Sequence, residues 1–119
     1  MTALPADLQA ILDSVHDAAT RKLAKDCVAL DVRGLSSFTD LLYICHGSSA
    51  RAVDAISEEI LGALTAGKHR GFHVEGRAGQ QWVLIDGGNV MIHVFLEEKR
   101  HYYDLERLWH DAPKVPLAA

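Results

Sequence analysis

Alternating apolar and polar positions between residues 82 and 96 predict a β-hairpin. Two strands, Trp82–Asp86 and Val90–Leu96, are joined by residues that can form a two-residue turn, either Gly87-Gly88 or Gly88-Asn89. Side chains alternate between the two sides of a strand, so both turns give the hairpin the same two faces. One face is wholly aliphatic and consists of Val83, Ile85, Val90, Ile92, Val94 and Leu96.

The opposite face of this hairpin, called the mixed face below, combines aromatic, apolar and charged side chains. It comprises Trp82, Leu84, Asp86, Met91, His93 and Phe95. Such a composition is found either in a second core layer or on a surface that docks a partner. We expect the aliphatic face to enter the core and the mixed face to dock a partner.

Periodicity in the rest of the chain predicts the remaining elements. Apolar residues recur at helical spacing over residues 5–25 and 49–66, and a charged, aromatic helix is predicted over about Lys99–His110. Further strands are predicted at Cys27–Val32, Leu41–Cys45 and, briefly, His73–Gly76. Residues 111–119 contain two prolines and no periodicity, which predicts a loose segment.

This order of elements, α-β-β-α-β-β-β-α, indicates the α/β class. We expect a two-layer α/β sandwich whose mixed sheet of about five strands carries the two long helices on its aliphatic side. Helices would then lie mainly on one face, with the final helix along the edge or rim of the sheet. The 119 residues are expected to form a single domain over residues 1–112, followed by a flexible tail over residues 113–119.

The charge of the chain narrows the choice of partner. Its net charge is −4, whereas a protein that grips RNA through phosphates presents a basic face. We therefore expect no direct sequence-specific contact with nucleic acid, and a basic protein as the partner. The chain has no apolar run of the roughly 20 residues that a membrane span needs, and no signal peptide. We expect a cytoplasmic protein that does not contact a membrane.

The best candidate for catalytic chemistry is the strand-to-helix corner at residues 43–51. Gly47, Ser48 and Ser49 precede a predicted helix and could cradle a phosphate, with Arg51 adding positive charge. This corner resembles the Gly-Ser corner of nucleotidyltransferases, which also need a pair of acidic residues one position apart on the next strand to hold magnesium. No such pair lies on a predicted strand. In the alternative reading Ser48 or Ser49 caps the helix, and Arg51 pairs with a carboxylate such as Asp40.

No other pattern in the sequence indicates an active site, a metal site or a cofactor. The seven histidines are scattered and form none of the spacings typical of metal ligands. Cys27 and Cys45 are expected to be buried free thiols. With no nucleophile elbow and no P-loop, we expect a protein that is not an enzyme.

The final predicted helix supplies further candidate docking residues. Leu105 and Trp109 are expected to anchor it to the core, and four other side chains to face outward. Tyrosine, tryptophan and arginine are enriched in binding hot spots, and this helix follows the mixed strand directly. The complete expected docking set is Trp82, Leu84, Asp86, His93, Tyr103, Asp104, Glu106 and Arg107.

Two blocks of residues resemble one known family. The first contains Glu75-Gly76, then W-V-L-x-D at 82–86, V-x-x-H-V-F at 90–95 and R-x-Y-Y-D-L-E-x-L-W at 100–109. The second is T-D-x-x-x-I-C-x-G-x-S-x-R at 39–51. Over about residues 6–112 the chain resembles the Iojap family, the bacterial ribosomal silencing factors.

The resemblance implies a nucleotidyltransferase-like topology without the catalytic acids, and a function without a cofactor. Members of the family bind ribosomal protein fourteen of the large ribosomal subunit. They thereby block association with the small subunit and repress translation when nutrients are scarce. Two alternatives remain open at this point: an adaptor for assembly of the large subunit, and a nucleotide-binding, nucleotidyltransferase-like enzyme. The mixed face could also join two copies of the chain in a homodimer.

Overall fold

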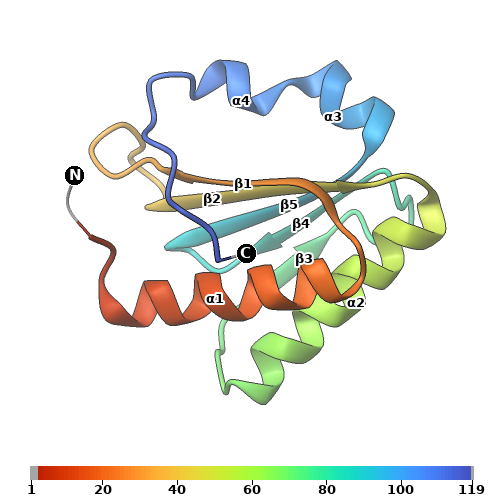
Figure 1. The fold of residues 1–119 in the computed structure, drawn as a ribbon, viewed down its shortest axis with the longest axis horizontal. Coiled ribbons are helices and arrows are strands. Elements are labelled where there is room, and N and C mark those ends of the chain that lie inside the picture. The colour runs from red at the N-terminus through yellow and green to blue at the C-terminus, as the bar shows by residue number, and fades with distance from the viewer. Residues whose placement is uncertain (1–2, 119) are drawn as a thin grey trace.

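A five-stranded mixed sheet forms the middle layer of the molecule in this computed structural model, which describes residues 3–118 (Figure 1). The strand order is β1-β2-β5-β4-β3, in which β2 and β5 are parallel and all other neighbours are antiparallel. The strands are β1 (Lys25–Asp31), β2 (Leu41–Gly47), β3 (His73–Glu75), β4 (Trp82–Asp86) and β5 (Val90–Leu96). The α/β class and the mixed sheet of five strands are confirmed.

Two long helices, α1 (Ala6–Arg21) and α2 (Ala50–Ala66), cover one face of this sheet (Figure 1). The apolar stripe of each helix packs onto side chains of the four longest strands, which together form the main core. That core contains Val83, Ile85, Val90, Ile92 and Val94, all at most 1% exposed, with Leu96 packed at its margin. The aliphatic face of the hairpin therefore lies in the core, as its alternation predicts.

The hairpin turn has one of the two expected registers. Asp86 pairs with Met91 and Val83 with Val94, so the two-residue turn is Gly88-Asn89. The amide of Gly87 donates to the carbonyl of Val90 over 2.9 Å and closes the turn. Gly88 has a φ of +81°, which a side chain would strain and which the first position of a type II′ turn requires.

The opposite face of the sheet is more fully covered than the sequence indicates. The predicted final helix is broken into α3 (Glu97–Tyr103) and α4 (Leu105–Leu108), which cross above the sheet in Figure 1. Leu105 and Trp109 pack with a second core made of Leu30, Val32, Leu42, Ile44, Phe95 and Ala112. The expectation of one helix along the rim is wrong, because β1 and β2 also present apolar side chains on this face and these require a cover.

The end of the chain also differs from the expectation of a loose tail. Pro113 O accepts a hydrogen bond from Asp31 N, and Val115 N donates to Ala29 O, at 2.9 and 2.8 Å. Residues 113–115 thus add to the free edge of β1, whose backbone groups would otherwise be unpaired. The carbonyl of Ala118 bonds to Nε2 of His16 over 2.9 Å. This segment binds to the domain through its backbone, which side-chain periodicity does not report.

Helix α1 ends four residues before its expected boundary at residue 25. Leu23 has a φ of +61° and is 78% exposed, although its spacing places it on the apolar face of a continued helix. The turn over residues 22–24 redirects the chain into β1, so Leu23 leaves the core. No helix within residues 3–118 is long and apolar enough to cross a membrane.

Candidate docking face

Four rings stack on the uncovered part of the mixed face, where β4 and β5 meet α3. This aromatic cluster consists of Trp82, His93, Phe95 and Tyr103. The ring centroid of Trp82 lies 5.0 Å from that of Phe95 and 4.5 Å from that of Tyr103. His93 stacks on Phe95 with centroids 6.0 Å apart and an interplanar angle of 11°. Offset ring pairs at such distances are stabilising, so the cluster joins the hairpin to α3.

A hydrogen bond inside the aromatic cluster fixes the state of His93. Trp82 Nε1–H donates to His93 Nδ1 over 3.0 Å. Because indole nitrogen can only donate, Nδ1 must be unprotonated and the neutral ring carries its proton on Nε2. Burial lowers the pKa of His93 to about 4, and the nearby carboxylate of Asp86 opposes that shift. His93 is 7% exposed and neutral, so it supports Trp82 from beneath and offers little surface to a partner.

Beside this cluster lies a groove of about 290 Å³ lined by Glu75, Gly76, Trp82 and Leu84. Trp82 and Leu84 are half-buried: each packs on the sheet and exposes its outer part. Gly76 permits this arrangement, since a Cβ on it would stand 2.1 Å from the carbonyl oxygen of Trp82. Its φ of +83° also favours glycine. The groove is therefore apolar on one side and carries the carboxylate of Glu75 on the other.

Asp86 has a structural partner at the end of β4. Its Oδ1 accepts a hydrogen bond from the amide of Gly88 over 2.9 Å, which stabilises the hairpin turn. The side chain remains partly exposed. Asp86 thus lies at the hairpin tip, at one end of the face that carries Leu84 and Trp82.

Glu106 is directed inward by a buried arginine. Arg100, 6% exposed, donates from Nε and Nη2 to the two carboxylate oxygens of Glu106 over 3.0 and 3.2 Å. Its Nη1 donates to the carbonyl of Lys25 over 3.3 Å and contacts Nδ1 of His46 at 3.0 Å. Burial, and next the charge of Arg100, lower the pKa of His46, which keeps its ring neutral as the acceptor. One guanidinium therefore connects β1, β2, α3 and α4.

Asp104 is the residue at which the expected helix breaks. Its φ of 49° and ψ of 55° place it in the left-handed region, which aspartate tolerates better than most residues. Residues six apart on a continuous helix point to different sides, so Arg100 could not grip Glu106 without this break. Asp104 itself stays exposed between the two short helices.

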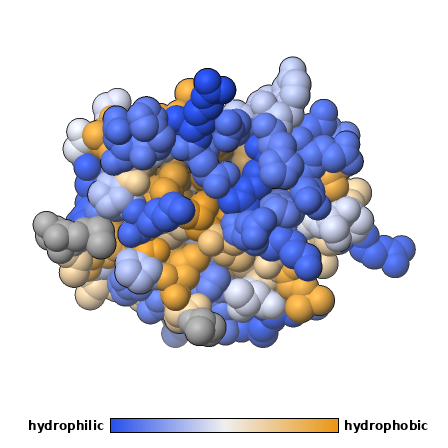
Figure 2. Space-filling view, turned by 45° about the horizontal axis from the view of Figure 1, so that its top comes forward, coloured by the Kyte–Doolittle hydropathy of each residue, from blue (hydrophilic) through white to orange (hydrophobic). Residues whose placement is uncertain are grey.

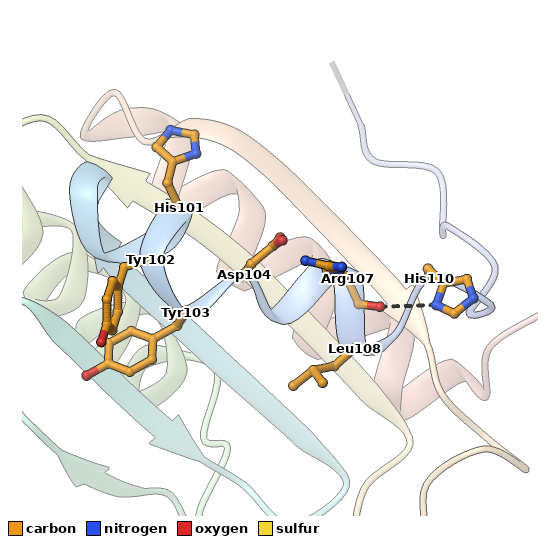
Figure 3. A pocket seen from close by; sticks show the side chains of 7 residues that line it. All are labelled: His101, Tyr102, Tyr103, Asp104, Arg107, Leu108 and His110. Atoms are coloured by element: carbon orange, nitrogen blue, oxygen red, sulfur yellow. Dashed lines mark hydrogen bonds between the residues drawn. The ribbon is translucent and has the colours of Figure 1, made fainter.

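A second hollow, of about 640 Å³, lies along the outer side of α3 and α4. Figure 3 shows Tyr102 and Tyr103 directed to the same side of α3, with Leu108 projecting the same way from α4. Asp104 lies between α3 and α4 and Arg107 projects from α4, and His110 Nδ1 lies 3.1 Å from the carbonyl of Arg107. In Figure 2 this side of the molecule is mainly polar, with apolar side chains exposed in between. Its residues are His101, Tyr102, Tyr103, Asp104, Arg107, Leu108 and His110.

The structure brings part of the expected docking set together. Trp82 and Leu84 share the groove, and Tyr103 joins it to the second hollow, where Asp104 and Arg107 lie. His93 instead supports this surface from within, whereas Glu106 pairs with Arg100 and keeps 41% of its side-chain surface exposed. Sequence reasoning missed Arg100 as the support of α4, because an arginine on an amphipathic helix normally faces solvent. Glu75 and Tyr102 also line the two hollows. Both lie in the block that resembles the family, but they are not part of the expected docking set.

The strand-to-helix corner is explained by local structure. Ser49 is the N-cap of α2, and its Oγ accepts from the amide of Ala52 over 3.1 Å. Gly47 is buried where β2 meets α2, and a Cβ there would lie 3.0 Å from both Ala52 Cβ and Val53 N. Ser48 and Arg51 are exposed, and Arg51 pairs with no carboxylate in the described part of the chain. The expected pair with Asp40 is absent there.

Comparison with known proteins extends this description. Residues 5–119 match the family described as ribosomal silencing factor during starvation, RsfS. The chain is 40% identical over 112 residues to the ribosomal silencing factor RsfS of Halalkalibacterium halodurans, covering 92% of this chain and 93% of that protein. It is also 40% identical over 109 residues to RsfS of Bacillus subtilis, covering 92% of each.

A crystal structure of a similar protein and a more distant relative agree with this family match. A crystal structure of a protein from Bacillus halodurans has a TM-score of 0.80 and 38% identity to this chain, covering 92% of it and 99% of that protein. A mouse protein named mitochondrial assembly of ribosomal large subunit protein 1 is 28% identical over 101 residues, covering 82% of this chain and 44% of its own length. Together these likenesses define a ribosome-associated regulatory protein. The chain belongs to the ribosomal silencing factor family, RsfS, and the resemblance found in the sequence is confirmed.

The neutral state of His93 makes stability depend on pH. Its pKa is about 4 in the folded chain, and it should return to an ordinary value near 6.5 on unfolding. Between these values the unfolded chain binds a proton that the folded chain does not, so the free energy of unfolding falls as pH falls from about 7 to about 4. We predict that protonation of His93 in the unfolded chain lowers the free energy of unfolding by about 3 kcal/mol over this pH range.

Urea unfolding at several pH values measures this contribution, with His93→Gln as the matched variant. Glutamine can accept the indole hydrogen bond through its carbonyl oxygen but does not titrate in this range. The stability of the wild type should therefore fall more steeply with decreasing pH than that of the variant. Parallel curves for the two proteins would contradict the buried neutral state.

The internal role of Glu106 can be tested through stability. Glu106→Gln removes the charge that faces the buried guanidinium of Arg100, and we expect it to lower the free energy of unfolding by about 2 kcal/mol. Asp104→Asn is the control, because asparagine also tolerates the left-handed region and the side chain is exposed. That control should change stability by less than about 0.5 kcal/mol. Stability is measured by urea unfolding. Equal stability of both variants and the wild type would contradict a stabilising role of the pair between Glu106 and Arg100.

Proposed function

We propose that this chain binds the large ribosomal subunit through its ribosomal protein fourteen and sterically blocks association with the small subunit. By occupying the surface that the small subunit needs, it would repress translation under nutrient limitation without any catalytic step. In this proposal the chain acts in the cytoplasm, as a protein that is not an enzyme. The docking face is the surface formed by Trp82, Leu84 and Tyr103, with Asp86, Asp104 and Arg107 around it.

The observation that carries the proposal is the groove at Trp82 and Leu84. Both side chains are held in place from beneath, Trp82 by His93 and Phe95 and Leu84 by its place in β4, yet both remain partly exposed. Aromatic and aliphatic side chains that are rigid before binding lose little conformational entropy when a partner covers them. On the opposite face of the sheet, α1 and α2 cover the aliphatic side chains of β4 and β5 and bury them in the main core.

Charge favours a basic partner for this face. Glu75 lines the groove, Asp86 lies at the hairpin tip and Asp104 lines the second hollow, and the chain has a net charge of −4. Ribosomal proteins are typically basic, so complementary potentials would speed and orient the encounter. Glu106, whose charge is balanced by Arg100, should contribute less to this attraction than its sequence position indicates.

A second candidate function is that of an adaptor for assembly of the large subunit. The mouse relative is named for assembly of the mitochondrial large subunit, and an adaptor would use the same docking face. The two functions differ in their effect on mature particles: a silencing factor blocks subunit joining, whereas an adaptor need only bind. A homodimer formed through the same face would compete with both, and light scattering at several concentrations would reveal it.

Co-sedimentation with purified large subunits, followed by addition of small subunits, tests the proposal. We expect the wild-type chain to sediment with large subunits and to reduce joining. Trp82→Ala should weaken binding by about 30-fold, equivalent to about 2 kcal/mol, if it is a hot spot. Leu84→Ser removes apolar contact without disturbing the aromatic cluster, and should weaken binding at least about tenfold.

The matched control is Leu23→Ser, which changes an exposed leucine at the turn between α1 and β1. It should bind and block joining as the wild type does. Binding without an effect on joining would favour the assembly adaptor. Failure of the folded wild-type chain to bind large subunits, or normal binding by folded Leu84→Ser, would contradict the proposed docking face.

A further inference from the structure

The two cysteines of the chain lie across from each other on β1 and β2. Lys25 pairs with His46 and Val28 with Ile44, so Asp26 and Cys27 together oppose the single residue Cys45. This is a β-bulge, and Asp26 has the left-handed φ of 47° that a bulge residue can adopt. Residues facing each other on antiparallel strands have Cα atoms about 4.5–5.5 Å apart, which lies within the range that a disulfide spans.

The two thiols differ in their access to solvent. Cys45 is completely buried in the main core, between the sheet and the helices. Cys27 is half-buried and lines a groove of about 470 Å³ between β1 and the C-terminal segment. Other residues along this groove are Val28, Ala29, Lys114, Val115, Pro116 and Leu117. A small solute can therefore reach Cys27 from the groove, whereas Cys45 exposes no surface to solvent.

The two thiols also differ in their protonation. The pKa of Cys27 is lowered, and the largest cause is its hydrogen bond with Cys45. The hydroxyl of Tyr43 acts in the same direction. The same partner, together with burial, raises the pKa of Cys45. The hydroxyl of Tyr43 is held 2.8 Å from His16 Nδ1, at the same end of the sheet. These effects make the accessible Cys27 the more readily ionised of the two thiols.

We propose that Cys27 and Cys45 form a peroxide-reactive pair that closes to an intramolecular disulfide between β1 and β2. The Cys27 thiolate attacks a hydroperoxide, the O–O bond breaks, and Cys27 becomes a sulfenic acid while hydroxide, or an alkoxide from an organic peroxide, leaves. The sulfur of Cys45 then attacks the sulfur of Cys27. An S–S bond forms, the S–O bond breaks, and water leaves with the proton of Cys45. The two cysteines are oxidised and the peroxide is reduced.

This disulfide would change the stability of the domain and leave the docking face untouched. It would close the connection between β1 and β2 into a covalent loop, which restricts the unfolded chain. Neither sulfur belongs to the aromatic cluster or to the groove at Leu84, so the modification is independent of the proposed binding to the ribosome. A thiol reductant should reverse it.

Intact-mass analysis after hydrogen peroxide treatment and alkylation tests the proposal on the full chain. The wild type should lose both alkylatable thiols and the mass of two hydrogen atoms, and peptide mapping should find Cys27 joined to Cys45. Dithiothreitol should restore both thiols. The melting temperature of the oxidised protein should exceed that of the reduced protein by about 5 °C.

Two variants separate the roles of the sulfurs. In Cys45→Ser the sulfenic acid at Cys27 should persist and be captured by dimedone, whereas in Cys27→Ser the buried Cys45 should stay reduced. Cys27→Ser changes a half-buried position, and its circular dichroism spectrum shows whether the fold is kept. If Cys45→Ser does not fold, peptide mapping of the oxidised wild type still shows whether Cys27 is joined to Cys45. Two intact thiols after treatment, oxidation of Cys27 to the sulfinic acid without a cross-link, or a disulfide between two chains would overturn the proposal.

Discussion

A buried guanidinium sets the geometry of the second face of the sheet. Arg100, a residue of α3, has only 6% of its surface exposed, and a buried cation is tolerated only when its hydrogen bonds and charge are matched. Glu106 supplies the charge, and Lys25 and His46 supply the acceptors. To bring Glu106 back to Arg100, the chain breaks its helix at Asp104. The same break leaves Tyr103 at the end of α3, where its ring contacts that of Trp82 at an interplanar angle of 43°.

The two faces of β5 pack against different parts of the molecule, and one of them lies beneath the proposed docking face. On one side its aliphatic residues pack under α1 and α2, and on the other His93 and Phe95 support Trp82. A side chain that is to meet a partner must be partly exposed, and an exposed tryptophan is well placed only if its surroundings hold it. The hydrogen bond to a neutral histidine and the stacked rings provide that support. These contacts restrict the orientation of the Trp82 side chain, which is what the proposed docking by occupancy requires.

Sequence patterns predicted the parts of the structure that depend on side-chain burial. The two faces of the hairpin, the helical stripes over α1 and α2, and the inner position of β2 follow from alternation and periodicity. The patterns failed where backbone conformation and backbone hydrogen bonds determine the structure. The break at Asp104, the pairing of Pro113 and Val115 with β1, and the left-handed turn at Leu23 all depend on backbone hydrogen bonds or φ, which hydrophobic patterns do not report. At the docking face, the sequence pattern did not reveal that Glu106 pairs with Arg100, because this partner is six residues away across the break.

Side-chain footprinting of the chain on the large ribosomal subunit would test the docking face most directly. Hydroxyl radicals would label the free chain and the bound chain, and mass spectrometry would compare labelling residue by residue. Docking through this face predicts that Trp82, Leu84 and Tyr103 lose reactivity in the complex while the exposed Leu23 keeps it. Unchanged labelling of Trp82 and Leu84 in a chain that remains bound, with protection over α1 and α2 instead, would contradict it.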